Sequence, residues 1–505
     1  MQSAAVPLFS FDNTYARELQ GFYVPWKPAQ APSPRLLFLN QPLAEELGLD
    51  SAVLRGDEGM AIFAGNSVPP GAEPLAQAYA GHQFGGFSPQ LGDGRALLLG
   101  ETLDREGRRR DIAFKGSGRT PFSRGGDGRA AVGPMLREVL IGEAMHALGI
   151  PTTRALAVAA TGESVPREKM LPGAVLTRVA SSHLRVGTFE FFAARGDIDK
   201  LRQLADYAIA RHDPDLAGTP GRYLELLRRV AGRQAALIAQ WMNAGFIHGV
   251  MNTDNMTISG ETIDYGPCAF MEAYDPHAVF SSIDHNGRYA YRNQPPIAQW
   301  NLTRLAETLV PLMAEDDDED AAKQAVADAT AVIESFGPLY QVHLLRGQRA
   351  KLGLSDAGDD GAAADTALAN DWLGLLHAQA VDFTLGWRRL ADTAAGNDAA
   401  LEALFADAQP LRDWLARWRD SCARDGATSP EARAEGMRRA NPSVIARNHR
   451  VEEALAAASE RGDMEPFERL LSAVRNPYAD NPENAAFAEP APAAVTACYQ
   501  TFCGT

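Results

Sequence analysis

The chain has 505 residues, of which 46% are hydrophobic and 22% charged, so it predicts about three structural units and excludes global disorder. Its 64 Asp and Glu outnumber 48 Lys and Arg, and this net charge of −16 argues against nonspecific binding to nucleic acid or anionic membranes. No apolar run reaches the roughly 20 residues of a membrane span, and no signal-peptide pattern opens the sequence, so we expect a cytoplasmic globular protein.

Short apolar runs separated by Gly-rich turns predict strands between about residues 36 and 194. The predicted strands are Arg95–Glu101, Ile112–Lys115, Ala155–Ala160 and Ala174–Val179. One helix is predicted among them, over Met135–Leu148, because apolar residues recur at helical spacing and a Gly and a Pro follow.

From about residue 197 the apolar spacing becomes helical. The predicted helices are Tyr223–Ala244, Ile297–Met313, Asp371–Asp392, Ala399–Ala423 and Glu452–Ala458. Composition predicts a solvated acidic cluster at 314–320, a flexible surface loop at 355–365 and an extended tail over the surface at 476–493. A strand-rich part that holds one helix, followed by a helical part, predicts an α+β molecule of two lobes that join near residues 185–200.

Two short segments of the strand-rich part are candidates for binding phosphate. Leu91–Arg95 reads LGDGR, in which two glycines let backbone N–H groups approach an anion, although alone the pattern favours an ordinary hairpin turn. Lys115 closes an apolar strand about 20 residues later, as does the phosphate-binding lysine of protein kinases. Glu138, on the apolar face of the predicted helix, is its candidate partner, because a buried carboxylate needs a cation. A solvated Lys and Glu remain the alternative.

Basic residues follow in the same part of the chain. Gly116–Ala130 combines several glycines with three arginines, a composition that suits a clamp over phosphates but is also common in surface loops. Arg178 and Arg185 stand at the end of a later predicted strand and just beyond it, and arginine forks bind phosphate in a bidentate way.

The segment FIHGVMNTDN, followed by IDYG, carries the most specific pattern. His248 precedes Asn255 by seven residues, as in the catalytic loop of kinases, and Asp264 begins a DYG that stands in for the metal-binding DFG. The catalytic Asp of a kinase would be residue 250, which is Val250 here, while Asp254 has appeared beside the candidate metal ligand Asn255.

Long strings of this sequence resemble the selenoprotein O family, also called YdiU proteins. They include FDNTYARELQGFYVPW, YAGHQFGGFSPQLGDGRA, HGVMNTDNM, DYGPCAFM and NGRYAYRNQPPIAQWNL, and the resemblance covers nearly the whole chain. It implies a protein-kinase-like two-lobed fold with family-specific N- and C-terminal extensions. It also implies a protein adenylyltransferase that binds ATP in a flipped orientation, transfers AMP to hydroxyl side chains of proteins and releases pyrophosphate. Transfer of UMP from UTP is attributed to some members.

The resemblance assigns roles residue by residue. Lys115 would bind phosphates with Glu138 as its partner, Asp254 would accept the proton of the attacking hydroxyl, and Asn255 and Asp264 would hold Mg²⁺ or Mn²⁺. The implied ATP-binding residues are Gly92, Gly94, Arg95, Lys115, Asp127, Gly128, Arg178, Arg185 and Asp264. The implied partners are ATP and proteins with Ser, Thr or Tyr hydroxyls, including this chain itself, with no nucleic acid and no membrane.

The predicted organisation has four parts. Residues 1–75 form an N-terminal extension, 76–190 the N-lobe, 191–350 the helical C-lobe, and 351–505 a helical extension with a Cys-containing tail. Cys503 stands where animal members of the family carry selenocysteine, which makes a redox role conceivable for Cys268, Cys498 or Cys503. Reduced thiols are the favoured reading.

Two other functions remain open at this stage. A kinase would transfer the γ-phosphate, but Val250 and the two arginines that would retain the terminal phosphates argue against it. A pseudokinase would bind nucleotide without catalysis, but the intact set of Lys115, Asn255 and Asp264 argues against it.

Overall fold

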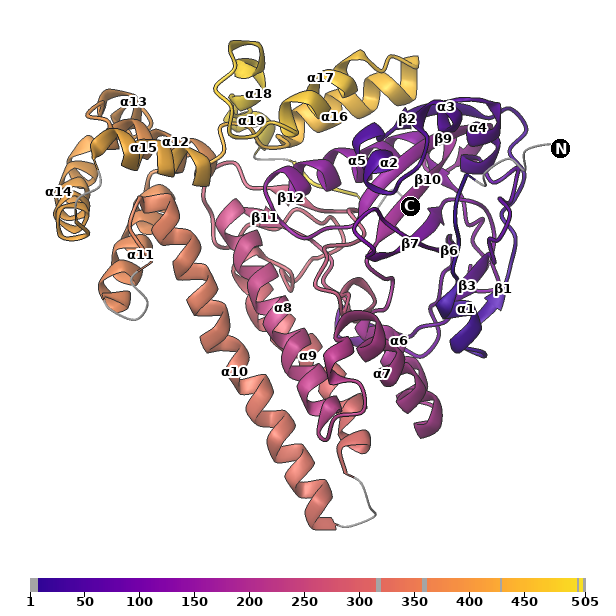
Figure 1. Cartoon of the computed structure of the whole chain (residues 1–505). Helices are drawn as coiled ribbons and strands as arrows, with labels where there is room; N and C mark the ends of the chain where they lie inside the picture. The colour runs from indigo at the N-terminus through magenta and orange to yellow at the C-terminus, as the bar shows by residue number, and fades with distance from the viewer. Residues whose placement is uncertain (1–7, 315–318, 357–360, 427–428, 497–498, 503–505) are drawn as a thin grey trace.

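In the computed structural model, an antiparallel sheet of eight strands lies beside a large helical part (Figure 1). The structure describes residues 8–314, 319–356, 361–426, 429–496 and 499–502. The strands run in the order β1-β3-β6-β7-β10-β9-β2, and β8 pairs with β10. Their bounds are β1 Tyr23–Pro25, β2 Arg35–Leu39, β3 Leu75–Gln77, β6 Ala96–Leu103, β7 Arg109–Lys115, β8 Ala130–Ala131, β9 Arg154–Pro166 and β10 Met170–Ala180. The predicted α+β class and the four predicted strands are confirmed.

Helices cover both faces of the sheet. Helix α5 (Val132–Ala147), the predicted helix, packs against β9 and β10 with Leu136, Val139 and Leu140 fully buried. A second apolar cluster lies on the other face, under the short helices α2 (Gln41–Glu46), α3 (Ser51–Arg55) and α4 (Asp57–Phe63). Segment 1–75 also supplies both outer strands of the sheet, and it begins with the short helix α1 (Thr14–Glu18).

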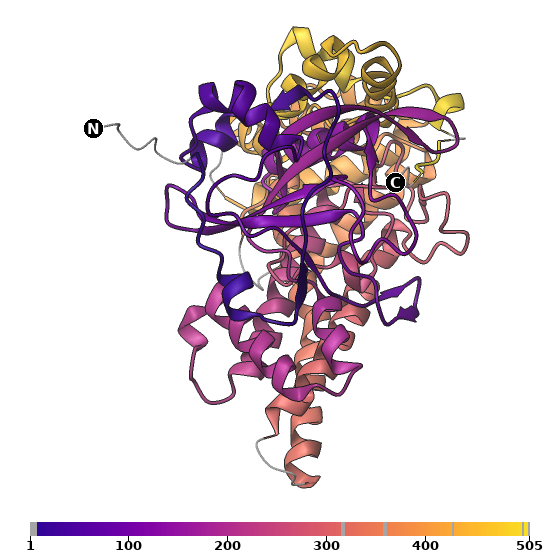
Figure 2. The ribbon, with the colours of Figure 1, turned by 90° about the vertical axis from the view of Figure 1, so that its right-hand side faces the viewer.

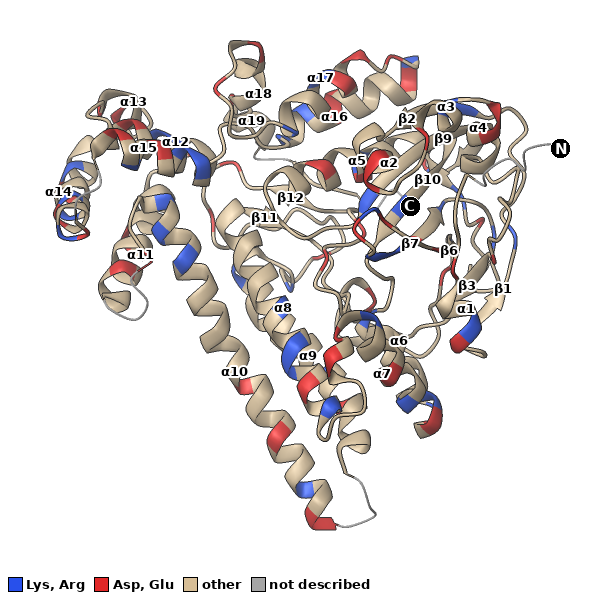
Figure 3. Cartoon of the chain, viewed as in Figure 1, with Lys and Arg blue, Asp and Glu red and all other residues tan. Residues whose placement is uncertain are grey.

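The helical part that follows is built around three long helices that pack on one another. They are α8 (Arg222–Ala244), α9 (Gln294–Met313) and α10 (Glu319–Leu352), preceded by α6 (Val186–Ala193) and α7 (Ile198–His212). In the view of Figure 2, one end of α10 projects beyond the rest of the molecule. Acidic and basic residues both occur along α10 and around the sheet, so the net negative charge is not confined to one element (Figure 3). Within the described residues, no helix combines the length and hydropathy that crossing a membrane requires.

Two predicted helices are wrong in their extent, because each is interrupted. The stretch 371–392 divides into α11 (Ala362–Ala378) and α12 (Phe383–Ala394), with Ala380 at φ 50° between them. The stretch 399–423 divides into α13 (Ala399–Glu402) and α14 (Ala408–Arg424). In both cases an aspartate side chain, Asp382 or Asp407, caps the second helix by accepting a backbone N–H. With α15 (Pro430–Ala440) these helices enclose four buried tryptophans.

The C-terminal segment returns over the strand-rich part. Helix α16 (Asn448–Ala456) continues into a π-helical turn, Ala457–Arg461, and α17 (Glu465–Val474) follows, both packing on α5. The predicted extended tail is partly wrong, since it contains a 3₁₀ turn at Pro482–Asn484 and helix α18 (Ala485–Ala488), before α19 (Ala493–Thr496). Residues 315–318 of the predicted acidic cluster and 357–360 of the predicted surface loop lie outside the described residues. The end of the predicted loop is wrong, because helix α11 already begins at Ala362.

Candidate active site

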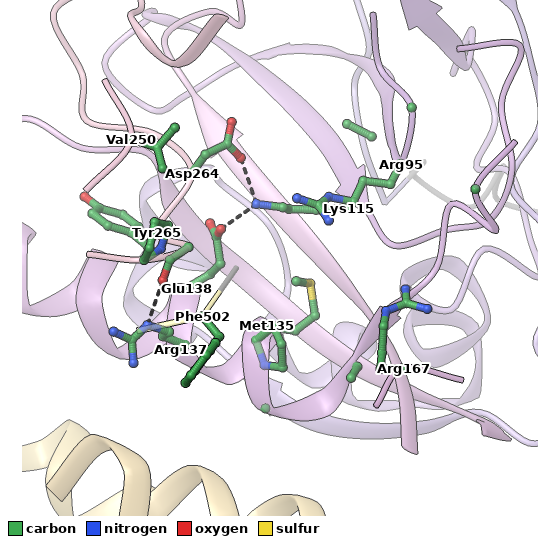
Figure 4. Close-up of a pocket in the computed structure, with 18 of the residues that line it drawn as sticks. Arg95, Lys115, Met135, Arg137, Glu138, Arg167, Val250, Asp264, Tyr265 and Phe502 are labelled. Carbon is green, nitrogen blue, oxygen red and sulfur yellow. Dashed lines mark hydrogen bonds and ion pairs between the residues drawn. The ribbon is translucent and has the colours of Figure 1, made fainter. Parts of the chain in front are cut away.

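A cavity of about 1090 Å³ opens between β6, β7, α5 and the loop that precedes Asn255. Every residue that the sequence nominated for the site lines it. They are Gly92, Gly94, Arg95, Lys115, Asp127, Gly128, Glu138, Arg178, Arg185, Asp254, Asn255 and Asp264. Figure 4 shows Lys115 from the sheet, Glu138 from α5 and Asp264 from the DYG segment pointing toward one another.

Lys115 is buried at the end of β7, where β6 and β10 flank it in the sheet. Its Nζ lies 2.5 Å from Glu138 Oε1 and 2.7 Å from Asp264 Oδ1 (Figure 4). Glu138 is itself buried on α5, which is tolerable because the lysine neutralises it. The predicted pairing is present, so the alternative of a solvated Lys and Glu is wrong.

Asp264 gathers the positive charges of the site. Arg178 Nη1 lies 2.7 Å from its Oδ1 and Arg185 Nη1 lies 2.9 Å from its Oδ2, in addition to Lys115. Burial alone would raise the pKa of this carboxyl, but Lys115, Arg178 and Arg185 hold it well below its usual range. Its backbone is left-handed, at φ 62°, a conformation that aspartate adopts more readily than most residues and that recurs at functional sites.

Arg178 is held by a buried chain of polar residues that sequence reasoning missed. Its Nε donates to His183 Nε2 at 3.2 Å, and His183 Nδ1 lies 2.9 Å from Asp111 Oδ2. Burial lowers the pKa of His183, so the ring is neutral and can accept from the arginine. Asp111 in turn accepts from Arg211, which is 100 positions away in the sequence. No local sequence motif therefore predicts this row of polar residues.

The predicted catalytic loop follows β11 (Phe246–Ile247), which pairs with β12 (Ala269–Phe270). His248 is buried and bridges the two sides of the loop, because its Nε2 lies 2.9 Å from Ile263 O while its Nδ1 faces the Val250 N–H. The Asn255 side-chain amide nitrogen donates to Val250 O at 3.1 Å. Val250 lines the cavity and presents only methyl groups there.

Asp254 lies under a small hairpin, β4 (Gly81–Gln83) and β5 (Gly86–Ser88). Gln83 Nε2 donates to Asp254 Oδ2 at 3.1 Å, whereas Oδ1 is buried and has no hydrogen-bond partner within the described structure. Burial raises the pKa of Asp254 to about 6, although Arg185 opposes the shift. The hairpin comes from a region about 170 positions earlier, so Gln83 had no sequence signal.

The glycine-rich loop, Gly116–Ala130, supplies another side of the cavity. Gly92 has φ +75°, and a Cβ there would meet the Phe122 ring at 2.4 Å, so the LGDGR turn and the loop pack directly on each other. Asp127 accepts from Arg167, another cavity residue that the sequence did not nominate, at 2.8 Å. Arg95 and Arg167 both project along this side in Figure 4.

Residues 499–502 supply a last wall of the cavity. Thr501 donates its N–H to Phe280 O and its hydroxyl to Pro267 O, both at 2.7 Å, and Phe502 lies on the same side as Arg137 and Glu138 (Figure 4). Cys268, next to Pro267, is buried and free, and burial raises its pKa to about 11. Its thiol is therefore protonated at neutral pH. Cys498 and Cys503 lie outside the described residues.

The sequence of this chain is similar to those of known proteins over nearly its whole length. Residues 7–475 match the family model described as Protein adenylyltransferase SelO. The chain belongs to the SelO family. A protein of Cereibacter sphaeroides called Protein nucleotidyltransferase YdiU is 61% identical over 98% of this chain and 100% of its own. Proteins of the same name from Chromobacterium violaceum (60% identical, 96% of this chain and 99% of theirs) and Rhizobium etli (58%, 98% and 97%) are similarly close.

Membership of the SelO family confirms the predicted recognition and the predicted enzyme class. The protein is a nucleotidyltransferase that modifies proteins, and its family name implies ATP as co-substrate.

Proposed function

We propose that this enzyme transfers AMP from ATP to Ser, Thr or Tyr hydroxyls of proteins, and releases pyrophosphate, in a kinase-like site that binds ATP inverted. One observation carries the proposal. Lys115, Arg178 and Arg185 converge on Asp264 in the interior of the cavity, while the position of the kinase catalytic base is the apolar Val250. Such a concentration of buried cations suits the retention of terminal phosphates rather than their transfer.

The inverted orientation has further support in the set of residues that line the cavity. In this proposal Lys115, Arg178 and Arg185 bind the β- and γ-phosphates, and Gly92, Gly94 and Arg95 line the nucleotide. Asp127 and Gly128, in the glycine-rich loop, reach the adenosine end. All of these residues line one continuous cavity. A volume of about 1090 Å³ exceeds what a nucleotide of this size requires, which leaves room for an acceptor side chain.

The two-lobed arrangement belongs to the same proposal. Residues 76–190 would be the N-lobe and 191–350 the C-lobe, with extensions at 1–75 and 351–505. The origin of the cavity residues supports this arrangement. Lys115 and Glu138 come from the part that contains the sheet, whereas Asp254, Asn255 and Asp264 come from the helical part. The cavity therefore lies where two such lobes would meet.

The donor set fits a hard divalent cation. Asp264 offers a carboxylate and Asn255 an amide oxygen, and both line the cavity. No cluster of three His, Cys, Asp or Glu suited to a metal occurs among the described residues, so phosphate oxygens and water would complete the shell. Bound Mg²⁺ or Mn²⁺ would neutralise charge that develops on the phosphates.

The residues of the chain account for the remaining chemistry. The acceptor oxygen attacks the α-phosphorus, the bond from that phosphorus to pyrophosphate breaks, and the hydroxyl proton passes to Asp254. A carboxyl with a pKa of about 6 is ionised at neutral pH yet basic enough to accept this proton. Lys115 and the two arginines neutralise the departing pyrophosphate.

Incubation with α-³²P-ATP and, in parallel, γ-³²P-ATP tests the proposal. The acceptors are the protein itself and added protein, the metal is Mg²⁺ or Mn²⁺, and the products are separated on a denaturing gel. Label from the α-position alone, lost in Asp264→Ala, is the expected result, and α-³²P-UTP in a third lane tests transfer of UMP. Label from the γ-position alone would mean a kinase. If both wild type and Asp254→Ala bind ATP and no label appears, the pseudokinase reading replaces the proposal.

A further inference from the structure

The hairpin that covers Asp254 also presents exposed apolar side chains at the mouth of the cavity. Phe84 is 38% exposed, Phe87 is 43% exposed and Ile283, from the segment beside the tail, is 48% exposed. Phe84 and Ile283 line the cavity. We call Phe84, Phe87, Ile283 and Arg288 the hairpin platform.

Arg288 is the cation of this platform. Its guanidinium lies 4.9 Å from the centre of the Trp300 ring and close to Gly85 in the turn of the hairpin. No carboxylate of the described chain lies within ion-pair distance of it, whereas Arg304, over the same tryptophan ring, pairs with Glu307 at 2.8 Å. In a chain with 16 more acidic than basic residues, an arginine without an acidic partner beside the active site indicates a place for an external anion.

The platform is tied rigidly to the catalytic loop. The Phe84 N–H donates to Asn252 Oδ1 and to the Tyr289 hydroxyl, both at 3.1 Å, and that hydroxyl donates to Asn252 Oδ1 at 2.6 Å. Phe84 has φ 51°, which is unfavourable for an aromatic residue, and these hydrogen bonds hold it there. These hydrogen bonds keep the Phe84 ring exposed beside the cavity and tie it to Asn252, which is two positions before Asp254.

We infer that the hairpin platform binds the protein acceptor, and that it selects a segment with an acidic side chain within a few residues of the hydroxyl. The acidic side chain would pair with Arg288, and an apolar neighbour would cover Phe84, Phe87 and Ile283. The inference rests on the proposed function, whose acceptor it specifies. The same hairpin carries Gln83, which donates to Asp254, so a segment bound on the hairpin would lie next to the base.

Two peptide libraries provide the test. Each peptide carries one Ser, Thr or Tyr and one Leu in a varied background, and the libraries differ only in having Glu or Gln within four positions of the hydroxyl. With α-³²P-ATP we expect wild type to label the Glu library about tenfold more efficiently, as a charge-assisted contact predicts. Arg288→Met should abolish the difference, and Arg288→Glu should reverse it toward a third library with Lys in place of Glu.

Controls separate the platform from the chemistry and from folding. Arg439→Met, on an exposed arginine of α15, should keep the wild-type preference. Phe87→Ser should raise KM for the Glu library about tenfold while ATP affinity, measured by titration, stays unchanged. Equal labelling of the two libraries by wild type, or a preference that survives Arg288→Met, would overturn the inference. So would failure to label any peptide in an enzyme that still labels itself from α-³²P-ATP. If no protein or peptide is labelled from the α-position, the proposed function itself fails.

Discussion

Lys351, a buried lysine of α10, lies against two aromatic rings, 4.9 Å from the centre of Trp387 and 5.6 Å from that of Phe383. Burial lowers its pKa to about 7. Between that value and 10.5, the unfolded chain holds a proton that the folded chain has released, so this lysine makes stability rise with pH across the interval.

We therefore expect Lys351→Met to be more stable than wild type at pH 6.5, by an amount on the order of a few kcal/mol. The advantage should shrink as pH increases toward 9.5, because wild type gains stability and the methionine variant does not. Urea unfolding at several pH values measures this. Lys323→Met, on an exposed lysine of the same helix, should show no such trend. A difference in stability between Lys351→Met and wild type that stays constant across the pH range would contradict the lowered pKa of Lys351.

His183 acts on the site through Arg178, which makes it a positioning residue. His183→Ala removes the acceptor of the Arg178 Nε–H, so we expect kcat/KM for ATP to fall about tenfold, mainly through KM. His183→Gln should restore most of the activity, since its amide can accept from Arg178 and donate to Asp111. Equal loss in both variants would mean that the histidine serves packing alone.

At the scale of elements, the hairpin β4–β5 depends on a glycine where it crosses Asp254. A Cβ on Gly81 would lie 2.5 Å from Asp254 Oδ1 and 2.9 Å from Leu91 Cδ1, so Gly81→Ala must displace the hairpin or the carboxylate. We expect a roughly 100-fold loss in the rate of AMP transfer with little change in ATP affinity. In Gly86→Ala the new Cβ meets only Gln83 O at 3.5 Å, so that variant should retain activity. Similar rates for the two variants would contradict this account of the hairpin.

The sequence predicted elements where local periodicity was strong. Helix α5 and strands β6, β7, β9 and β10 were recognisable because their apolar residues recur with a clear period. The breaks at residues 379–382 and 403–407 were missed, since apolar spacing continues through them and only Asp382 and Asp407 mark the new helix starts. The 34-residue helix α10 was also missed, because the exposed Pro338 lies inside it and its buried face starts with the small residues Ala325 and Ala329.

The residues of the candidate site also divide into those that a sequence pattern predicts and those that it does not. Lys115, Glu138, Asn255 and Asp264 belong to a spaced pattern, so the sequence could nominate them, and the structure brings them to one cavity. Gln83, His183 and Arg288 reach the site only through tertiary packing, over separations for which a single sequence has no signal. The metal, the individual residue roles and the cytoplasmic location stay predictions.

At the scale of the whole molecule, Arg447 joins three distant parts of the chain. This fully buried arginine lies 2.6 Å from both Glu272 and Asp382, and it donates to Ala488 O at 2.9 Å. It thereby links the segment after the DYG motif, the start of α12 and the C-terminal segment.

Removing this link should affect the entire fold. Arg447→Met leaves two buried carboxylates without their cation, so we expect a loss of about 3–5 kcal/mol in the free energy of unfolding. Arg450→Met, three positions along and in a surface pair with Glu453, should change it by less than about 1 kcal/mol. Denaturant unfolding of the two variants measures both values. A loss in Arg447→Met no larger than in Arg450→Met would mean that the buried link contributes little.

The wall formed by residues 499–502 has a consequence for biosynthesis. Thr501 closes the cavity against Pro267, which is 234 positions earlier in the chain. At ordinary rates of translation, roughly 10 to 50 s separate the emergence of these two residues from the ribosome. A nascent chain that already carries Lys115, Asp254 and Asp264 therefore lacks one side of its nucleotide cavity throughout this interval. The order of synthesis thus delays completion of the cavity wall until residues 499–502 have left the ribosome.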